Sequence, residues 1–207
     1  NFPDSFKNHI MPEQIHILSV CFVVDKLERN FGGTAGNIAY TMKMLGAEPI
    51  IASALGKDAG PYMEKLNALN INTKNIVLDT HLMTASAHIT TDVDDNQVTA
   101  FFNGPLKRGL DIKIENDSAK IVLISPTHKD VMIEHLNAAA DAGKVVVFDP
   151  GQQLGALTDI ELEKMIGRSK YVIGNDYEIK TIEKRIGWSA AKMADAGAVG
   201  ARPEVMG

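Results

Sequence analysis

The chain has 207 residues and a formal net charge of −5, with 45% hydrophobic and 23% charged residues. This ordinary globular composition excludes a disordered chain and predicts one domain, or one domain with a small appendage. The absence of any Lys/Arg block argues against nucleic acid or an anionic membrane as partner and favours small molecules. Because the chain has a single cysteine, Cys21, and neither a membrane-length apolar run nor a secretory signal, we expect a cytoplasmic location.

Two regions have the sequence character of strands. His16 to Val24 is apolar and β-branched, and Thr84 to Phe102 contains two alternating runs separated by the turn residues Asp94-Asp95-Asn96. Both regions suit a small antiparallel sheet that stands off the rest of the fold. Its use would be a lid, a dimer face or a purely structural extension.

The stretch Phe31 to Tyr40, FGGTAGNIAY, carries the most information about a site. Gly32 and Gly33 lack Cβ atoms and so let a ligand approach the backbone, and Thr34 and Asn37 open a predicted helix. The residues alone favour an anion at this helix start, with a tight turn as the alternative. A dinucleotide site fits poorly, because the pattern is Gly-Gly-x-x-Gly and a charged segment precedes it.

The rest of the chain alternates short apolar runs with helical stripes. This order predicts an α/β fold with a parallel sheet, right-handed crossovers and ligands at the carboxyl ends of the strands. From Ser189 the sequence becomes rich in Ala and Gly without strand signals, which fits a helix, a linker or a foreign tail. The predicted strands are 49–55, 120–124, 144–148 and 170–173, and the predicted helices are 58–69 and 130–142.

Polar residues follow three of the predicted strands. Asn175 and Glu178 share one face at a helix start directly after the strand that ends at Ile173, and taken alone they favour a helix cap. Asp149 follows another strand at the same edge, while Ser125-Pro126-Thr127-His128 fits a turn as well as a site. His128 and His135 have no metal-ligand spacing with a cysteine, so we interpret them as surface or helix histidines.

A family resemblance joins the N-terminal motifs. Gly32 to Ala39, then Leu45-Gly46, then Ala54 to Gly60 resemble, in order and spacing, the signature of the ribokinase or PfkB-type carbohydrate and nucleoside kinases. The likeness extends more weakly from about Phe2 to Gly187 and is greatest to bacterial adenosine and sugar kinases. It implies a ribokinase-like α/β domain with a small antiparallel β-lid. The implied organisation is a kinase domain over 1–188, lid segments at about 16–31 and 84–103, and a tail over 189–207.

The resemblance also implies an activity and a set of site residues. The family transfers the γ-phosphoryl group of ATP to a hydroxyl, here of a ribonucleoside, adenosine first, or of a sugar such as ribose or fructose. A sugar would then replace the anion at the glycine stretch, and the lid would exclude water and offer a face for a homodimer. The implied acceptor-side residues are Gly32, Gly33, Asn37, Phe22, Phe102 and, in second rank, Asp149; Asn175 and Glu178 would lie beside the nucleotide phosphates, with Glu178 holding Mg²⁺ through water.

Two parts of the family pattern are not found in these residues. The family's catalytic base is an Asp in a Gly-Ala-Gly-Asp motif, whereas Gly197-Ala198-Val199-Gly200 has no Asp, and the family's first strand is not found either. We therefore expect a kinase shortened at both ends, with a weak or inactive 207-residue chain. The alternatives are a non-catalytic ligand-binding or dimerising fragment and a dinucleotide-binding enzyme.

Overall fold

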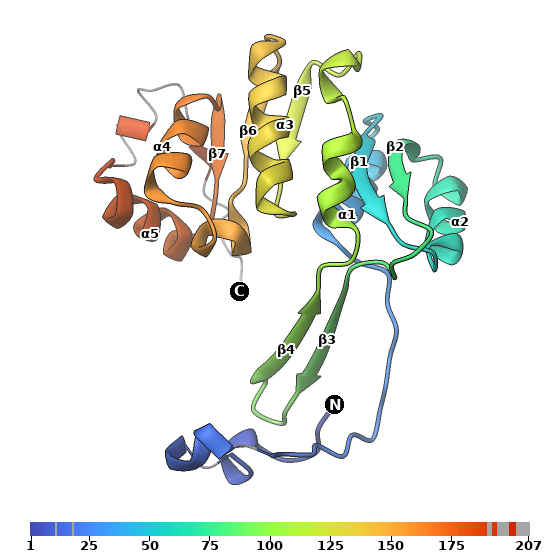
Figure 1. The fold of residues 1–207 in the computed structure, drawn as a ribbon, viewed down its shortest axis with the longest axis vertical. Coiled ribbons are helices and arrows are strands. Elements are labelled where there is room, and N and C mark those ends of the chain that lie inside the picture. Colours follow the sequence, from blue (N-terminus) through green and yellow to red (C-terminus); the bar gives the residue numbers. More distant parts are fainter. Residues whose placement is uncertain (11, 18, 190–191, 194–198, 202–207) are drawn as a thin grey trace.

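The computed structural model describes residues 1–207 except 11, 18, 190–191, 194–198 and 202–207 (Figure 1). From residue 34 onward strands and helices alternate, as the sequence predicts, apart from an antiparallel hairpin in the middle of the chain. The helices are α1 Thr34–Met44, α2 Gly60–Ala68, α3 Lys129–Asp141, α4 Asp159–Gly167 and α5 Asp176–Ile186; the strands are β1 Ile50–Leu55, β2 Asn72–Leu78, β3 Ser86–Thr91, β4 Gln97–Phe102, β5 Ile121–Ile124, β6 Val145–Phe148, β7 Tyr171–Ile173 and β8 Val199–Ala201; and 3₁₀ turns span Phe6–Asn8, Pro12–Ile17, Leu106–Asp111, Ile114–Asn116 and Gly151–Gly155.

The parallel strands form two sheets instead of the one sheet that we expected. Strands β5, β6, β7 and β8 pair in that order, all parallel, and β1 pairs with β2, also parallel. In the described part of the chain no strand pairs with the second edge of β1 or of β5, and Ile121 at the open edge of β5 is 63% exposed. Ile121 and Leu123 of β5 are therefore less buried than the apolar run alone predicted.

Strand β8 lies in the Ala/Gly-rich segment where the sequence has no strand signal. Its residues Val199 and Gly200 pair with Tyr171 and Val172 of β7. A parallel ladder is built from backbone hydrogen bonds, so a neighbouring strand can extend it into a segment of weak β-propensity. The expectation that no strand follows Ser189 was wrong for this reason.

The main hydrophobic core lies between the four-stranded sheet and helices α3, α4 and α5. Helix α3 packs on β5 and β6 through a buried stripe that includes Met132, Leu136 and Ala139, which recur at helical spacing (Figure 1). Trp188, the single tryptophan, packs at the margin of this core. A second, smaller core of Ala39, Ile51, Leu66 and Ile71 joins α1, α2 and the two-stranded sheet.

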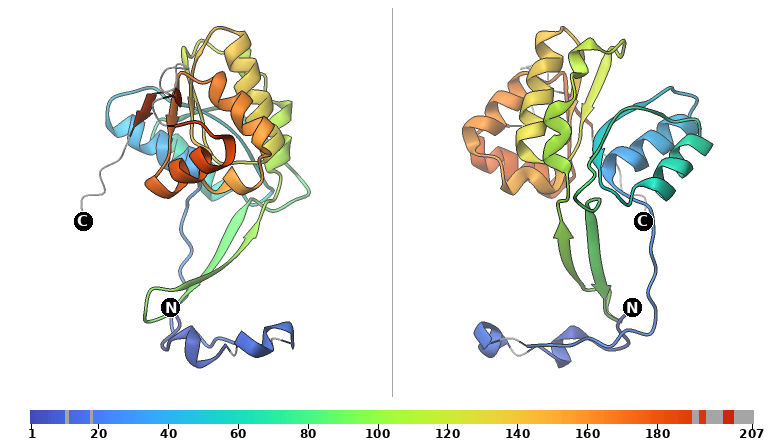
Figure 2. Two further views of the ribbon diagram at one scale, coloured as in Figure 1. Left: turned by 90° about the vertical axis from the view of Figure 1, so that its left-hand side faces the viewer. Right: turned by 45° about the vertical axis from the view of Figure 1, so that its right-hand side comes forward.

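Strands β3 and β4 form the predicted antiparallel hairpin. Their register runs from Ser86 opposite Phe102 at the root to Thr91 opposite Gln97 at the tip, and Asp95 in the turn has a φ of 62°, which Asp and Asn tolerate best after Gly. The hairpin projects away from the α/β body, and all of β4 is exposed (Figures 1 and 2). This confirms the prediction of a small antiparallel sheet standing off the main fold.

The N-terminal segment does not supply the additional strand that we predicted over His16 to Val24. A 3₁₀ turn covers Pro12–Ile17, and the described residues after it have no regular structure before α1. The Phe22 ring packs on Phe2 and Phe6, with ring centroids 4.8 and 4.7 Å apart, and the exposed thiol of Cys21 lies beside it in sequence. Clustering of the aromatic rings takes the place of a backbone ladder, which explains the wrong prediction.

The N-terminal segment is attached to the tip of the hairpin. The backbone N–H of Phe2 donates to the carbonyl of Thr91 at 2.8 Å, and the N–H of Phe6 donates to the buried carboxylate of Asp92, also at 2.8 Å. Asp92 further accepts from the backbone of Asp94 and Asn96. We call the hairpin and residues 1–30 together the lid. The first part of residues 1–30 lies across the hairpin tip, and the chain then runs back to the body beside the hairpin (Figure 2).

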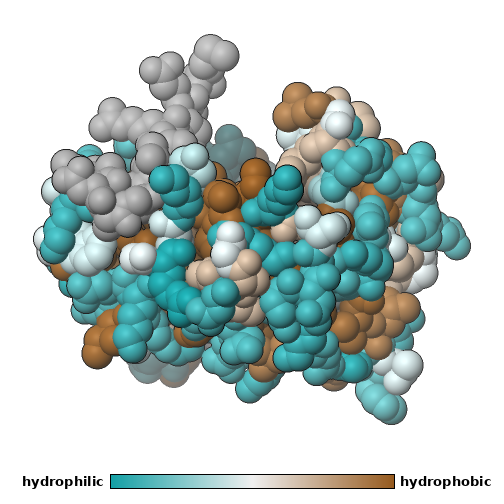
Figure 3. Space-filling view, turned by 90° about the horizontal axis from the view of Figure 1, so that it is seen from above, coloured by the Kyte–Doolittle hydropathy of each residue, from teal (hydrophilic) through white to brown (hydrophobic). Residues whose placement is uncertain are grey.

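The end of the molecule opposite the hairpin is mostly hydrophilic, with a smaller group of hydrophobic residues near its middle (Figure 3). Among the described residues, no helix combines the length and the apolar character that crossing a membrane requires.

Candidate functional site

The glycine stretch forms the turn that begins α1. Gly33 is the N-cap residue with a φ of 91°, a conformation that favours glycine, and a Cβ added at Gly32 would meet no atom within 4 Å. The N–H of Asn37, one turn into the helix, bonds the Gly33 carbonyl at 3.0 Å, and the Asn37 residue is exposed. The structure therefore brings Gly32, Gly33 and Asn37 together on an accessible surface, and we call residues 31–34 the glycine turn.

Tyr62 of α2 packs against the glycine turn and donates a hydrogen bond to it. Its hydroxyl donates to the carbonyl of Gly32 at 2.8 Å, and its ring stacks on Phe31 with a centroid distance of 5.0 Å. A Cβ at Gly36 would lie 1.8 Å from the same hydroxyl, so only glycine at that position leaves room for it. Burial raises the pKa of Tyr62 above its usual value. The sequence predicts a helix over 58–69, but no local pattern indicates this contact between residues 30 positions apart.

Asn175 and Glu178 form a reciprocal cap at the start of α5. The Asn175 side chain accepts from the N–H of Glu178, and the Glu178 carboxylate accepts from the N–H of Asn175, both at 2.9 Å. This confirms the helix-cap interpretation, in which each side chain satisfies an N–H that the helix leaves free. The cap follows β7 directly, so it lies at the carboxyl edge of the four-stranded sheet.

Asp149 lies at the same edge, after β6. Burial raises the pKa of its carboxyl, and the nearby charge of Glu178 raises it further, while a hydrogen bond from the Gly151 backbone opposes the shift. The two carboxyl groups are therefore close enough to interact, and Gly174 makes room for one of them, since a Cβ there would lie 3.1 Å from Glu178 Oε2. Within the described ranges no three His, Cys, Asp or Glu side chains gather as metal ligands.

This pair of carboxyls fits Mg²⁺ better than a closed metal cage. Mg²⁺ keeps several of its waters and binds proteins through one or two carboxylates. Burial raises the Asp149 pKa most and the charge of Glu178 adds to it; a cation beside the two carboxyls would offset that second contribution. Asp149, second in rank from the sequence, thus shares the edge with Asn175 and Glu178.

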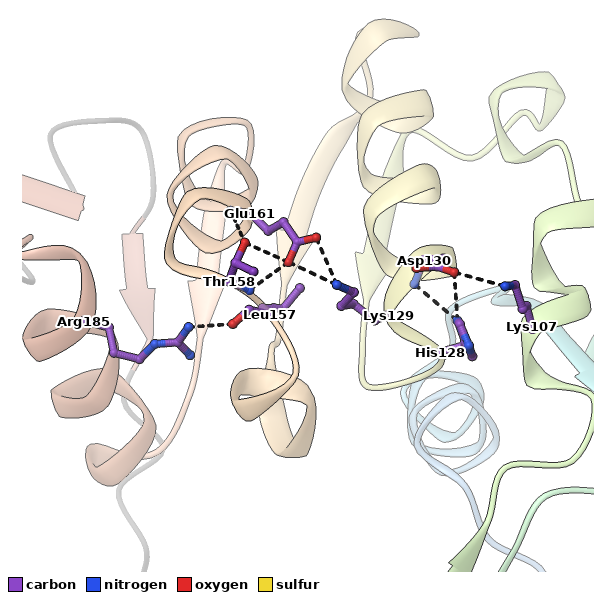
Figure 4. A network of polar contacts seen from close by, with 8 residues as sticks. All are labelled: Lys107, His128, Lys129, Asp130, Leu157, Thr158, Glu161 and Arg185. Atoms are coloured by element: carbon purple, nitrogen blue, oxygen red, sulfur yellow. Dashed lines mark hydrogen bonds and ion pairs between the residues drawn. The ribbon is translucent and has the colours of Figure 1, made fainter.

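A polar network fixes the loops at this edge (Figure 4). Lys129 at the start of α3 lies 3.0 Å from Glu161, which caps α4 together with Thr158, and Arg185 donates to the carbonyls of Leu154 and Leu157. The loop that follows Asp149 is thereby held between α3, α4 and α5.

The two histidines of α3 have structural roles. His128 caps the helix by accepting from the N–H of Asp130 at 3.3 Å, and Asp130 is also paired with Lys107 (Figure 4). The buried His135 lies 2.9 Å from the carbonyl of Gly109, and its burial lowers its pKa. His135 is a helix residue, as the sequence predicts, whereas His128 is the partly exposed N-cap residue that precedes α3.

The two aromatic residues expected from the lid lie at its opposite ends. Phe22 belongs to the aromatic cluster at the hairpin tip, so its described contacts are those of lid packing. Phe102 lies at the hairpin root, opposite Ser86, and is 44% exposed. Of the two, Phe102 lies at the end of the lid that adjoins the α/β body.

Comparison with known proteins gives a consistent set of likenesses. The family model described as pfkB family carbohydrate kinase matches residues 16–202. The chain is 29% identical over 164 residues to a nucleoside kinase of Methanothermobacter thermautotrophicus, an alignment that covers 77% of this chain and 53% of the relative. The chain thus spans about half the length of this curated relative.

Solved structures agree with the sequence match. The nucleoside kinase of Burkholderia thailandensis, solved in complex with inosine, superposes with a TM-score of 0.85 at 32% identity, over 98% of this chain and 66% of that one. The same kinase in complex with ADP-inosine gives a TM-score of 0.81 at 33% identity, over 98% of this chain and 65% of that one.

Proposed function

Because the chain belongs to the pfkB family of carbohydrate kinases, we propose that the protein it represents transfers the γ-phosphoryl group of ATP to a hydroxyl of a nucleoside. The observation that carries this proposal is the likeness, over 98% of the chain, to a nucleoside kinase solved with inosine. We place purine nucleosides first: adenosine, as the family resemblance implies, and inosine, with which that relative was solved. A simple sugar is the alternative acceptor within the family.

The glycine turn is the proposed binding site of the acceptor. Gly32 and Gly33 present bare backbone to a ligand, and the first N–H groups of α1 have no partner within the helix. The Asn37 amide offers donors and an acceptor, which match the hydroxyls of a ribose. Of the two aromatic residues, Phe22 and Phe102, we choose Phe102 as the contact to the base or the sugar, because it lies at the root of the hairpin.

The carboxyl edge of the four-stranded sheet is the proposed binding site of the ATP phosphates. Asn175 would lie beside them and Glu178 would hold Mg²⁺ through water. Asp149, which the resemblance places on the acceptor side, is close enough to Glu178 to share the ion. When bound, the ion neutralises charge on the phosphates and so favours transfer. Among the residues of the chain itself, Lys129 and Arg185 keep the neighbouring loops in place.

The base that would accept the proton of the hydroxyl is not assigned to any residue of this chain. The sequence has no Gly-Ala-Gly-Asp motif, and a missing base and anion hole remove acid–base and electrostatic contributions worth orders of magnitude in rate. We therefore propose that the 207-residue chain binds acceptor but turns over weakly or not at all.

The lid is the proposed face of a homodimer. A two-stranded hairpin is marginally stable by itself, and Ile89 of β3 and Phe101 of β4, which lie on the same face of the hairpin, are 54% and 57% accessible. A second lid packed on these side chains would bury them. Sedimentation at several concentrations tests this, and a monomer at every concentration would contradict it.

A thermal-shift titration tests the proposed acceptor. The chain is titrated separately with adenosine, inosine, ribose, fructose 6-phosphate and MgATP, because a ligand that binds only the folded state raises the melting temperature. We expect a shift with a purine nucleoside, and a shift with ribose or fructose 6-phosphate alone would favour the sugar alternative. No shift with any acceptor would contradict the proposed acceptor site.

A matched pair of variants places the binding at the glycine turn. Asn37→Ala removes an exposed amide of α1, whereas Asn67→Ala removes an exposed amide of α2. Each should change the free energy of unfolding by less than about 0.5 kcal/mol, the usual range for surface substitutions. Only Asn37→Ala should abolish the nucleoside shift, and an equal loss in both variants would place the ligand elsewhere.

A further inference from the structure

The carboxylate of Asp58 joins the lid to the body. Asp58 lies in the loop between β1 and α2, and one of its oxygens, Oδ1, accepts both the N–H and the hydroxyl of Thr84 at 2.7 Å. The other oxygen, Oδ2, lies 3.4 Å from the guanidinium of Arg29. Thr84 leads into β3 and Arg29 ends the N-terminal segment, so one side chain holds both parts of the lid where they leave the body.

The side chain of Asp58 is suited to this contact. It is 22% exposed, and the hydrogen bonds from the hydroxyl and N–H of Thr84 lower the pKa of its carboxyl. The group is therefore ionised at neutral pH, and hydrogen bonds to an ionised acceptor are stronger than neutral ones. The exposed Arg29 adds a weaker, salt-sensitive contact.

The root of the hairpin packs backbone against backbone around this carboxylate. A Cβ at Gly56 would lie 2.3 Å from Met83 C and from Thr84 N, and a Cβ at Gly104, at the end of the hairpin, would lie 2.6 Å from Met83 O. The N–H of Gly56 also donates to the Thr84 hydroxyl at 2.9 Å. The Thr84 hydroxyl thus both donates to Asp58 and accepts from Gly56.

A second aspartate, Asp79, fixes the loop that leads to the root of the hairpin. The Asp79 carboxylate accepts from the N–H groups of His81 and Leu82 at 2.8 Å and lies 3.4 Å from Arg108. Asp79 therefore fixes the loop before the hairpin, whereas Asp58 fixes the residue from which the hairpin departs.

The same short segment also reaches the glycine turn. Helix α2 begins at Gly60, directly after the Asp58 loop, and its Tyr62 donates to the carbonyl of Gly32. Residues 56–62 thus contact the lid root through Asp58 and the glycine turn through Tyr62. This segment therefore connects the root of the lid with the glycine turn.

We propose that Asp58 is the positioning residue that sets the lid over the glycine turn. It acts through Thr84 and Arg29 and does not touch the acceptor. The inference rests on the proposed function only in naming a nucleoside as the molecule that the lid covers. The attachment of the lid to Asp58 can be measured without any ligand.

Hydrogen exchange of the full 207-residue chain, read by mass spectrometry, tests the attachment. In Asp58→Ala we expect the amides of β3 and β4 to exchange about tenfold faster or more, because the variant loses a hydrogen-bonded ionised acceptor. The exchange of the amides of α3 and β6 should stay unchanged. Asp58→Asn keeps an oxygen for Thr84 and should show a smaller effect. The matched control is Asp141→Ala, which removes an exposed aspartate paired with Arg168 on the surface.

Two further variants keep the test decisive if Asp58→Ala fails to fold. Thr84→Val removes only the hydroxyl, and Arg29→Gln removes only the charge that pairs with Asp58. Because the contact with Arg29 is the weaker one, Thr84→Val should accelerate hairpin exchange more. Unchanged hairpin exchange in the variants of both Asp58 and Thr84 would overturn the proposal, as would equal acceleration in α3 and β6.

Adenosine and inosine binding separates this inference from the proposed function. If the unmodified chain binds either nucleoside, Asp58→Ala should weaken binding about tenfold and Asp141→Ala should not. If the unmodified chain binds neither while Asp58→Ala still loosens the hairpin, the proposed acceptor fails and the attachment stands. Unchanged affinity in a variant with a loosened hairpin would overturn the positioning role.

Discussion

Gly36, in the first turn of α1, leaves the space that the Tyr62 hydroxyl occupies. In Gly36→Ala the new Cβ would lie 1.8 Å from Tyr62 Oη and 3.1 Å from Cζ, so the ring must move away from Gly32. Overpacking costs about 1–3 kcal/mol, and the lost hydrogen bond about 1 kcal/mol. Alanine recovers about 0.5–1 kcal/mol in a helix. The net loss of about 1–3 kcal/mol should lower the melting temperature by about 3–10 °C.

Thermal unfolding followed by circular dichroism measures this loss, and a double-mutant cycle tests its cause. In a Tyr62→Ala background the clash is gone, so Gly36→Ala should become stabilising by about 0.5–1 kcal/mol. Gly60→Ala is the control, because a Cβ at Gly60 meets no atom within 4 Å. The same cost of Gly36→Ala in both backgrounds would refute the reasoning.

Two further predictions concern carboxyl groups. Burial and the charge of Glu178 raise the pKa of Asp149, so its ionised form costs stability above the folded pKa and this cost disappears at low pH. Asp149→Asn should therefore melt higher than the unmodified chain at pH 7 but not at about pH 3, below the usual carboxyl range; a pH-independent difference would contradict this. Burial opposes ionisation of Asp92, but the hydrogen bond from the Phe6 N–H and those from Asn96 outweigh it and lower the Asp92 pKa. The contact of the Asp92 carboxylate with the Phe6 N–H is thus present above the usual carboxyl pKa and is lost as the pH falls through the lowered pKa of Asp92. Asp92→Ala should lose this contact at every pH. Limited proteolysis at pH 7 should cut residues 1–30 faster in that variant, and cleavage at the unmodified rate would count against the contact.

The elements predicted from the sequence are those with a strong period or a continuous apolar run. The runs at 49–55, 120–124, 144–148 and 170–173 became β1, β5, β6 and β7, because continuous apolar, β-branched runs are typical of parallel strands. Strand β2 was missed because its sequence, NTKNIVL, mixes polar residues into an edge position. Helix α4 was missed although Thr158 and Glu161 form a Thr-x-x-Glu capping box that a sequence can reveal.

The site residues likewise divide into those that the sequence predicts and those that it does not. Local motifs predicted the glycine turn and the Asn175–Glu178 cap, since each lies within one turn of a helix. The contacts of Tyr62 with Gly32 and of Asp58 with Thr84 join residues 30 and 26 positions apart, and no local pattern indicates them. The predicted strand over His16 to Val24 failed because its β-propensity was outweighed by the packing of Phe22 on Phe2 and Phe6.

The positions of Cys21 and Trp188 equip the chain with two native optical probes. Cys21 is the only cysteine and is exposed on the lid, whereas Trp188 is the only tryptophan and packs at the margin of the main core. A thiol-reactive dye on Cys21 reports the surroundings of the lid, and tryptophan fluorescence reports the unfolding of the core. Loosening of the lid can therefore be distinguished from global melting in a single sample without any engineered residue.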